Sequence, residues 1–213
     1  MTILYFDCFS GAAGDMILGA LLDAGVPLDD LRRALGSLAI DRETVWTERV
    51  TRAGVSATKF HVRGEEPPVD GGHAHEHPSH SSHPSHRHAE EGSHPRTPAP
   101  SHPDGIHRTL PEISSLIDGS ALSASARNRA KALFGTLAEA EAAIHETSIE
   151  KVHLHEVGAL DSIIDIVGTV YALERLNPDR IVASPLNVGS GSIRSAHGLY
   201  PVPAPATTRL LQG

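Results

Sequence analysis

A stretch near the middle of the chain, residues 67–105, most constrains what this sequence can fold into. It contains 9 His, 8 Pro, 6 Ser and 4 Gly, and Val69 is its one branched aliphatic residue. Such a composition cannot bury enough apolar surface to offset the entropy lost when a chain becomes ordered. We therefore predict a disordered insertion, which leaves residues 1–66 and 106–213 to form the two parts of one folded domain.

The histidines of this stretch also predict a function for it. It holds nine of the 15 histidines in the chain. Imidazoles spaced two or three residues apart on a flexible segment can together bind one soft or borderline metal ion without a folded site. We interpret the stretch as a metal-binding tract for storage or delivery, with an inert linker as the alternative. Its candidate ligands are His73, His75, His77, His80, His83, His86 and His88.

Charge and composition exclude several classes of protein. Lys and Arg number 18 against 26 Asp and Glu, for a net charge of −8, and aromatic residues make up 4% of the chain, so nucleic acid is not an expected partner. The single Cys8 cannot form an intrachain disulfide. The first residues lack a secretory leader, and no apolar run reaches the roughly 20 residues needed to cross a membrane. We expect a cytoplasmic protein with no membrane contact.

Hydrophobic periodicity predicts interleaved strands and helices. The expected strands are 3–7, 44–50, 55–63, 151–155 and 180–188, and the expected helices are 16–22, 110–117, 126–144 and 161–176. Residues 52–54 should form a hairpin turn, and Gly- and Pro-rich loops should follow Val188. This order predicts an α/β fold, an α+β sandwich with a mixed sheet and packed helices, ferredoxin-like in part.

The first candidate site follows the first predicted strand, at 7–15, with the sequence DCFSGAAGD. Small residues between a strand and a helix allow backbone N–H groups to approach an anion. The candidate substrate-binding residues are Ser10, Gly11, Gly14 and Asp15, and Asp7 is a candidate metal ligand. The alternative is an ordinary turn in which the carboxylate of Asp15 favours the helix dipole.

The second candidate site is a group of imidazoles and carboxylates. His153 and His155 would project from one face of a strand, and Asp161 and Asp165 would share one face of the next helix. Together with Glu156 they form a credible site for zinc, nickel, iron or manganese, and they are the candidate catalytic residues. Exposed strand histidines and a helix-capping Asp161 are the alternative, although a carboxylate among the aliphatic neighbours of Asp165 needs a partner.

The third candidate site is a loop with the sequence NVGSGS at 187–192. Gly189, Ser190 and Arg194 could hold a phosphate with backbone donors and a guanidinium group, and His197 follows closely. The loop lacks the Lys that a P-loop requires after its second glycine. A stiff surface loop is the alternative interpretation.

Three blocks in this order resemble one protein family. The blocks are DCFSGAAGDM at 7–16, VHLHEVGALDSIIDIVG at 152–168, and NVGSG at 187–191 with HG at 197–198 and PVPAPAT at 201–207. They are similar to the nickel insertion proteins of the lactate racemase system, many of which also carry a variable histidine-rich stretch between the first two blocks.

The resemblance implies a nickel chelatase. Such an enzyme inserts Ni(II) into a pyridinium bis-thiocarboxylic acid mononucleotide and forms nickel–carbon and nickel–sulfur bonds. It implies CTP hydrolysis with Mn(II) or Mg(II) in a further C-terminal domain, which we expect to be absent here and supplied by a separate chain or an oligomer. The tract would pass nickel to His153 and His155, a histidine or carboxylate would remove a ring proton, and either Gly-rich loop would hold the phosphate.

Two other classes remain open from the residues. In the first, the chain is a noncatalytic nickel chaperone or storage protein, and the tract is its working part. In the second, the His and Asp cluster activates a metal-bound water, as in a metal-dependent hydrolase. Deletion of the tract distinguishes the first from an enzyme, and an assay of nucleotide and phosphoester hydrolysis tests the second.

Overall fold

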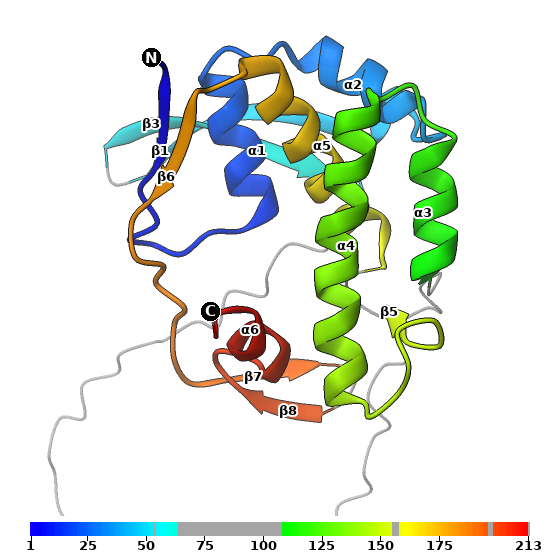
Figure 1. Ribbon diagram of the computed structural model, residues 1–213. Coiled ribbons are helices and arrows are strands. Elements are labelled where there is room, and N and C mark those ends of the chain that lie inside the picture. The colour runs from blue at the N-terminus through cyan, green and yellow to red at the C-terminus, as the bar shows by residue number, and fades with distance from the viewer. Residues whose placement is uncertain (53, 64–107, 155–157, 196–197, 213) are drawn as a thin grey trace, which may run out of the picture. The chain divides into compact units, whose positions relative to one another are not determined.

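The computed structural model describes residues 1–52, 54–63, 108–154, 158–195 and 198–212 (Figure 1). The predicted histidine tract lies outside this part of the chain. In chain order the elements are β1 (Ile3–Phe6), α1 (Gly14–Asp23), α2 (Leu28–Gly36), the short 3-10 helix η1 (Arg42–Thr44), β2 (Val45–Arg52), β3 (Val55–Val62), β4 (Arg108–Thr109), α3 (Leu110–Asp118), α4 (Ala124–Ile144), β5 (His153–Leu154), α5 (Leu160–Leu176), β6 (Arg180–Ala183), β7 (Ser192–Ser195), β8 (Gly198–Pro201) and α6 (Pro205–Leu210). None of the described helices is long and apolar enough to cross a membrane.

The described strands form four two-stranded sheets. Strands β1 and β6 are parallel, whereas β2–β3, β4–β5 and β7–β8 are antiparallel pairs. The prediction of one mixed sheet is therefore wrong. Helix α1 packs on β3, and its buried Leu21 belongs to a second cluster with Leu4 and Phe6 of β1, so α1 lies between the β2–β3 hairpin and strand β1. The described strands also do not build the four-stranded sheet that a ferredoxin-like arrangement requires.

Helix α1 lies directly on strand β3 because one of its buried residues has no side chain. A Cβ atom at Gly19 would overlap the carbonyl oxygen of Thr58. One turn further along the helix, Asp23 accepts hydrogen bonds from the backbone N–H of Thr58 at 2.9 Å and from its hydroxyl at 2.7 Å. These contacts attach the C-terminal half of α1 to the β2–β3 hairpin. The first turn of α1 lies beside the end of β1.

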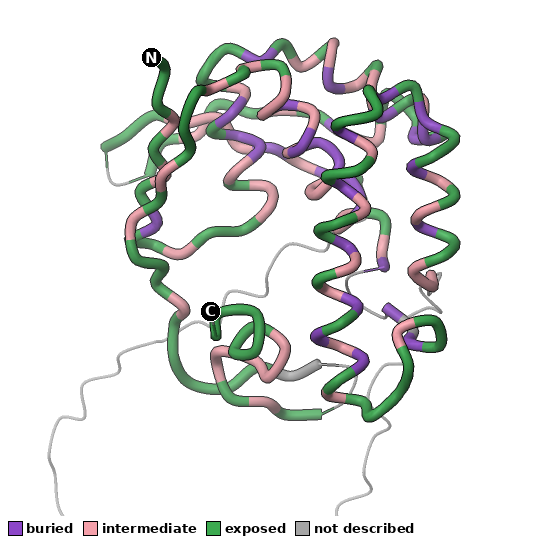
Figure 2. Tube along the Cα trace, viewed as in Figure 1, coloured by how far each residue is buried: buried purple, intermediate pink, exposed green. Residues whose placement is uncertain are grey.

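The main hydrophobic core lies among helices α1 to α5 and the β2–β3 hairpin, where buried positions recur along each helix (Figure 2). Its fully buried side chains include Leu18, Leu31, Phe60, Ile113, Phe134, Ile163, Ile164 and Val167. Each buried side chain of this size stabilises the fold by roughly 1.5–3 kcal/mol. Helix α5 contributes three of them, so its rotation about its own axis is set by the core.

Most of the predicted elements are confirmed. The expected helices up to α5 are present, as are the first strand and the β2–β3 hairpin, whereas the expected strand 151–155 is described only as the two-residue β5. The capping box of α3 is formed by Thr109 and Glu112, whose carboxylate accepts from the Thr109 backbone N–H at 2.7 Å. The expected strand 180–188 is too long, because β6 ends at Ala183, two residues before Pro185, which has no N–H to donate. Helix α2 was not predicted. The expected loops after Val188 are also corrected, since they contain β7, β8 and α6.

Candidate functional site

The first predicted site lies where the chain leaves the parallel pair β1–β6. The backbone N–H of Ser184, just after β6, donates to the carbonyl of Phe6 at 2.9 Å, and the N–H of Cys8 donates to Ser184 Oγ at 2.8 Å. The two strands are therefore held together one residue beyond the sheet. Ligands of open α/β sheets bind at this carboxyl end of the strands.

The third predicted site is joined to the first by hydrogen bonds. Asn187 donates its backbone N–H to the carbonyl of Cys8 at 3.2 Å and its side-chain Nδ2 to the carbonyl of Phe9 at 2.9 Å. Its Oδ1 accepts from the N–H of Gly189 at 3.0 Å. One asparagine therefore fixes both loops, although nearly 180 residues separate them in the sequence.

One residue of the second predicted site reaches the same place. Asp165 of α5 packs against the first residue of α1, Gly14, so closely that a Cβ atom there would overlap the carboxylate. The Oδ1 atom of Asp165 is buried. The absence of a side chain at Gly14 therefore allows the carboxylate of Asp165 to approach the helix closely. The dipole of α1 favours a negative charge at this end of the helix.

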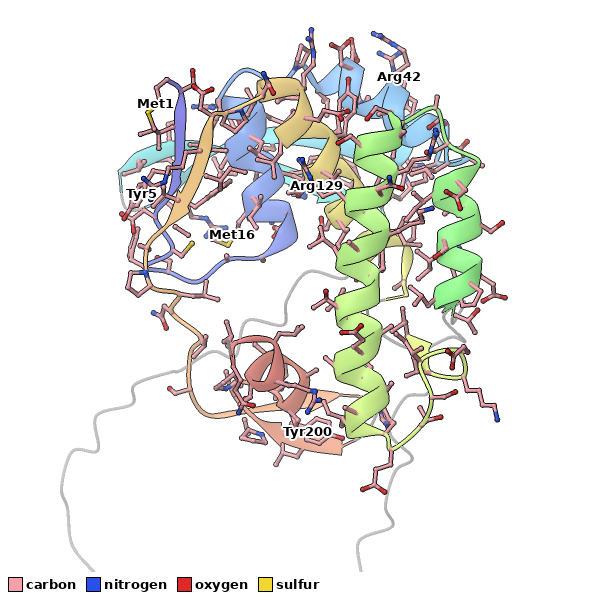
Figure 3. All side chains as sticks on the ribbon, in the orientation of Figure 1. Met1, Tyr5, Met16, Arg42, Arg129 and Tyr200 are labelled. Carbon is pink, nitrogen blue, oxygen red and sulfur yellow. The ribbon has the colours of Figure 1, made fainter. Side chains whose placement is uncertain are left out.

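We refer to the place where the loop after β1, Asp165 and the loop at Asn187 meet as the junction. A pocket of about 460 Å³ opens beside it. Its walls come from the ends of β1 and β6, from α1 between Met16 and Ala20, and from the second half of α5. Figure 3 shows Tyr5 on β1 and Met16 near the start of α1. The lining residues are Tyr5, Phe6, Asp7, Cys8, Gly11, Ala12, Met16, Ile17, Ala20, Thr169, Leu173 and Ala183. The volume lies in the usual range for small-molecule sites.

Several candidate residues lie elsewhere or outside the described part of the chain. Asp161 lies in the first turn of α5, and its Oδ1 accepts from the backbone N–H of Ser162 at 2.8 Å. The backbone of His153 pairs with Thr109 across β4–β5. The side chains of His153 and Arg194, and all of His155, Glu156, His197 and the tract histidines, fall outside what the structure describes.

The loop residues occupy different positions around the junction. Asp7 and Gly11 line the pocket, whereas Ser10 is exposed and Asp15 is half-buried in the first turn of α1. Gly189 and Ser190 are exposed on the neighbouring loop.

No metal-binding group of three or more His, Cys, Asp or Glu occurs among the described residues. The metal ligands therefore remain a prediction. What the structure brings together is the loop after β1, Asp165 of α5, and the loop that begins at Asn187.

Sequence reasoning missed the apolar half of the site. Thr169 and Leu173 line the pocket, and they follow Asp165 at intervals of four residues on α5. Residues at this spacing share one face of a helix, so the pattern was available in the sequence. Ser184, whose spacing carries no signal, was missed, and Asn187 was predicted only as the first residue of the third site.

The chain belongs to a family of nickel insertion proteins, because the family model described as "Nickel insertion protein" matches residues 4–213. A relative from Geobacillus kaustophilus, 44% identical over all of this chain and 45% of its own length, is named pyridinium-3,5-bisthiocarboxylic acid mononucleotide nickel insertion protein. A relative from Desulfitobacterium hafniense with the same name is 39% identical over all of this chain and 44% of its own length.

A third relative, from Roseiflexus castenholzii, is named a putative nickel insertion protein and is 41% identical over 98% of this chain. The chain spans a little under half the length of these curated relatives. No solved structure matches it.

Proposed function

We propose that this chain inserts Ni(II) into a pyridinium bis-thiocarboxylic acid mononucleotide, acting as the chelatase part of a nickel insertion protein. The observation that carries this proposal is the convergence of the family's three sequence blocks at one junction, where Asp165 contacts Gly14 and Asn187 bonds the loop after β1. Family membership by itself suggests the activity named for the relatives and gives no location for it in this chain. The junction adds a place in this chain where that chemistry fits.

The proposed reaction needs a base and a set of metal ligands. One ring C–H bond breaks, its proton goes to the base, and its electron pair forms the nickel–carbon bond, while the two thiocarboxylate sulfurs bind the same nickel. No electrons enter or leave. Of the candidate bases, Asp165 best fits the role, because its carboxylate lies against Gly14, where the loop after β1 enters α1. Glu156 and Asp161 are the alternatives.

The nickel ligands that we propose are His153, His155 and Asp7. Imidazole and carboxylate both suit nickel, and the thiocarboxylates of the substrate would supply the remaining ligands. The tract histidines would collect the metal and release it to these residues. Mn(II) or Mg(II) with CTP would act through the remainder of a full-length protein, as a separate chain or within an oligomer.

The nucleotide phosphate needs its own contact. The first turn of α1 already lies against the carboxylate of Asp165, which repels a second anion. Ser10 and Gly11 precede this turn, and Gly189, Ser190, Arg194 and His197 belong to the neighbouring loop. We therefore assign the phosphate to the Gly189–Arg194 loop in preference to Gly14 and Asp15.

The test is nickel transfer by the purified chain, mixed with the C-terminal half of a relative, Ni(II), CTP and the mononucleotide. Product is followed by its mass and its nickel content. Asp165→Asn, which keeps the shape of the side chain, should lower the rate by about a hundredfold or more, the usual contribution of a general base. The exposed Asp41→Asn is the matched control and should not change it.

A second variant tests the ligands. His153→Ala with His155→Ala should abolish product formation, while the circular dichroism spectrum stays that of the parent chain. Insertion at the parent rate in either set of variants would refute the assigned site, and no product from the parent chain under any condition would refute the function.

A further inference from the structure

Among the described strands, none lies along the outer edge of β1, the edge that faces away from β6. The carbonyl of Phe6 accepts from the backbone N–H of Ser184 at 2.9 Å, and the carbonyl of Thr2 accepts from residues at the start of β6. The even-numbered residues of β1 therefore direct their backbone groups toward β6. Because neighbouring residues of a strand direct these groups to opposite edges, the N–H and C=O groups of Ile3 and Tyr5 face the outer edge.

The side chains of the same two residues are apolar and exposed. Ile3 is 54% exposed and Tyr5 is 58% exposed (Figure 3). Successive side chains of a strand point to opposite faces, so these two lie on the face of β1 away from Leu4. Leu4 and Phe6 pack into the cluster around Leu21 of α1. Parallel strands are normally covered on both faces, and β1 is covered by α1 on one face only.

The two outer edges of the β1–β6 pair differ in their protection against a further strand. Strand β6 begins with Arg180 and lies between Pro178 and Pro185. Charged side chains and prolines are common means by which a sheet edge resists pairing with another strand. Strand β1 has the sequence ILYF, which contains neither. The outer edge of β1 is therefore the edge suited to accept a strand.

The relatives of this chain contain the polypeptide that could supply that strand. The chain spans 45% of the Geobacillus kaustophilus relative and 44% of the Desulfitobacterium hafniense relative, so more than half of each lies outside the match. We propose that an apolar strand from this remaining part pairs with the outer edge of β1 and covers Ile3 and Tyr5. Main-chain hydrogen bonds give such pairing its affinity, and the flanking side chains give it its specificity.

The added strand lies close to the candidate site. Strand β1 ends at Phe6, and Asp7 and Cys8 begin the loop that leads to the junction. In this chain β1 is held along one edge, by its bonds to β6. A strand on the second edge holds β1 from both sides and brings the remaining part of the protein within a few residues of that loop.

The experiment co-expresses the whole chain with the part of the Geobacillus kaustophilus relative that it does not match, so that the two can fold together. A tag on the relative's part isolates the complex, which should contain the two in equal amounts. Amide hydrogen exchange is then compared by NMR between the complex and the chain alone. The amides of Ile3 and Tyr5 should exchange at least about tenfold more slowly in the complex, whereas that of Ile181, at the outer edge of β6, should be unchanged.

Variants of the chain locate the contact. Tyr5→Pro removes one N–H group from the outer edge of β1, and Tyr5→Lys places a charge on the covered face. Each should lower recovery of the chain with the tagged part by about tenfold or more. Val55→Lys, at a 68% exposed position of β3, and Ile181→Lys, at a 49% exposed position of β6, are the matched controls and should not change recovery. If Tyr5→Pro alters the circular dichroism spectrum of the chain alone, Tyr5→Lys replaces it.

Several results would overturn the inference. These are no recovery of the parent chain, parent-level recovery of the Tyr5 variants, or slowed exchange at Ile181 in place of Ile3 and Tyr5. Dimerisation of the chain alone with slowed exchange at Ile3 and Tyr5 would also overturn it, because a second copy would then occupy the edge. Nickel and turnover enter none of these measurements, so a failure of nickel insertion leaves the strand pairing in place, and a failure of the pairing leaves the proposed function in place.

Discussion

The helical core and the β1–β6 pair are built in opposite ways. Phe134 and Phe60 have no exposed surface, whereas Tyr5 on β1 is 58% exposed and Ile181 on β6 is 49% exposed. Parallel sheets are normally covered on both faces, and here one face of the pair packs on α1 while the other carries exposed apolar side chains. The candidate site lies at the end of the second, thinly packed region.

This difference shows how stability and function are divided within the domain. The core sets the directions of α1 and α5, and hydrogen bonds between distant loops, from both backbone and side-chain groups, complete the site. Substitutions in the core should therefore change the free energy of unfolding, while substitutions at the junction should change binding and rate. The following predictions test that division, from the largest effect on stability to the smallest.

The largest effect is expected in the core. Phe134→Ala removes a completely buried ring and should lower the free energy of unfolding by about 3–5 kcal/mol, because it leaves a cavity among packed helices. Phe9→Ala removes a ring that is 75% exposed and should change it by less than about 0.5 kcal/mol. Urea unfolding followed by circular dichroism measures both. Similar losses in the two variants would contradict the contrast between the regions.

A smaller effect on stability, with a larger one on activity, is expected at the junction. Gly14→Ala places a methyl group against the carboxylate of Asp165 and should lower the free energy of unfolding by about 1–3 kcal/mol. It should also slow nickel insertion by about tenfold to a hundredfold, because the proposed base is displaced. Gly36→Ala, in α2 with open space around it, is the control and should preserve both properties. An active Gly14→Ala variant would remove Asp165 from the mechanism.

The link between α1 and the hairpin should show a pH dependence. Hydrogen bonds from Thr58, with the nearby Arg49 guanidinium, lower the pKa of Asp23 below its usual value. A lowered pKa stabilises the folded state above the pKa of the unfolded chain, and this contribution is lost as pH falls through the folded value. Asp23→Asn should therefore lower the free energy of unfolding by about 1 kcal/mol at pH 7, and by progressively less below about pH 4. Parallel stability curves for parent and variant would contradict this.

The smallest effect on unfolding is expected from the histidine tract. Replacing 67–105 by a short Gly/Ser linker should shift the midpoint of thermal unfolding little, because we predict that the tract buries no apolar surface. The same change should remove most of the bound nickel in equilibrium dialysis. Insertion at saturating nickel should continue if the chain is an enzyme with an accessory tract, whereas loss of all nickel-dependent activity would favour the chaperone or storage alternative.

Local patterns predicted much of the fold. The spacing of apolar residues located α1, α3, α4 and α5, and alternation located the β2–β3 hairpin, because each of these depends on neighbours within a few residues. Helix α2 was missed although Leu28, Leu31 and Leu35 show the same spacing. Strands β7 and β8 were missed because glycine and proline around them favoured a loop.

The candidate site was only partly predictable. Its blocks were recognised from short runs of residues, and Asp165 was singled out because a carboxylate among aliphatic residues needs a partner. That its neighbour would be Gly14, and that Asn187 would bond to the loop at Cys8, followed from no spacing in the sequence.

The sequence by itself determined which segments form helices and hairpins, and which family the chain resembles, since both depend on residues that are close together in the chain. Only the tertiary structure decided that β1 pairs with β6 and that Asp165 meets the start of α1. These contacts join residues more than 150 positions apart, and each is chosen by the packing of the whole core. A local pattern carries no information about such a choice.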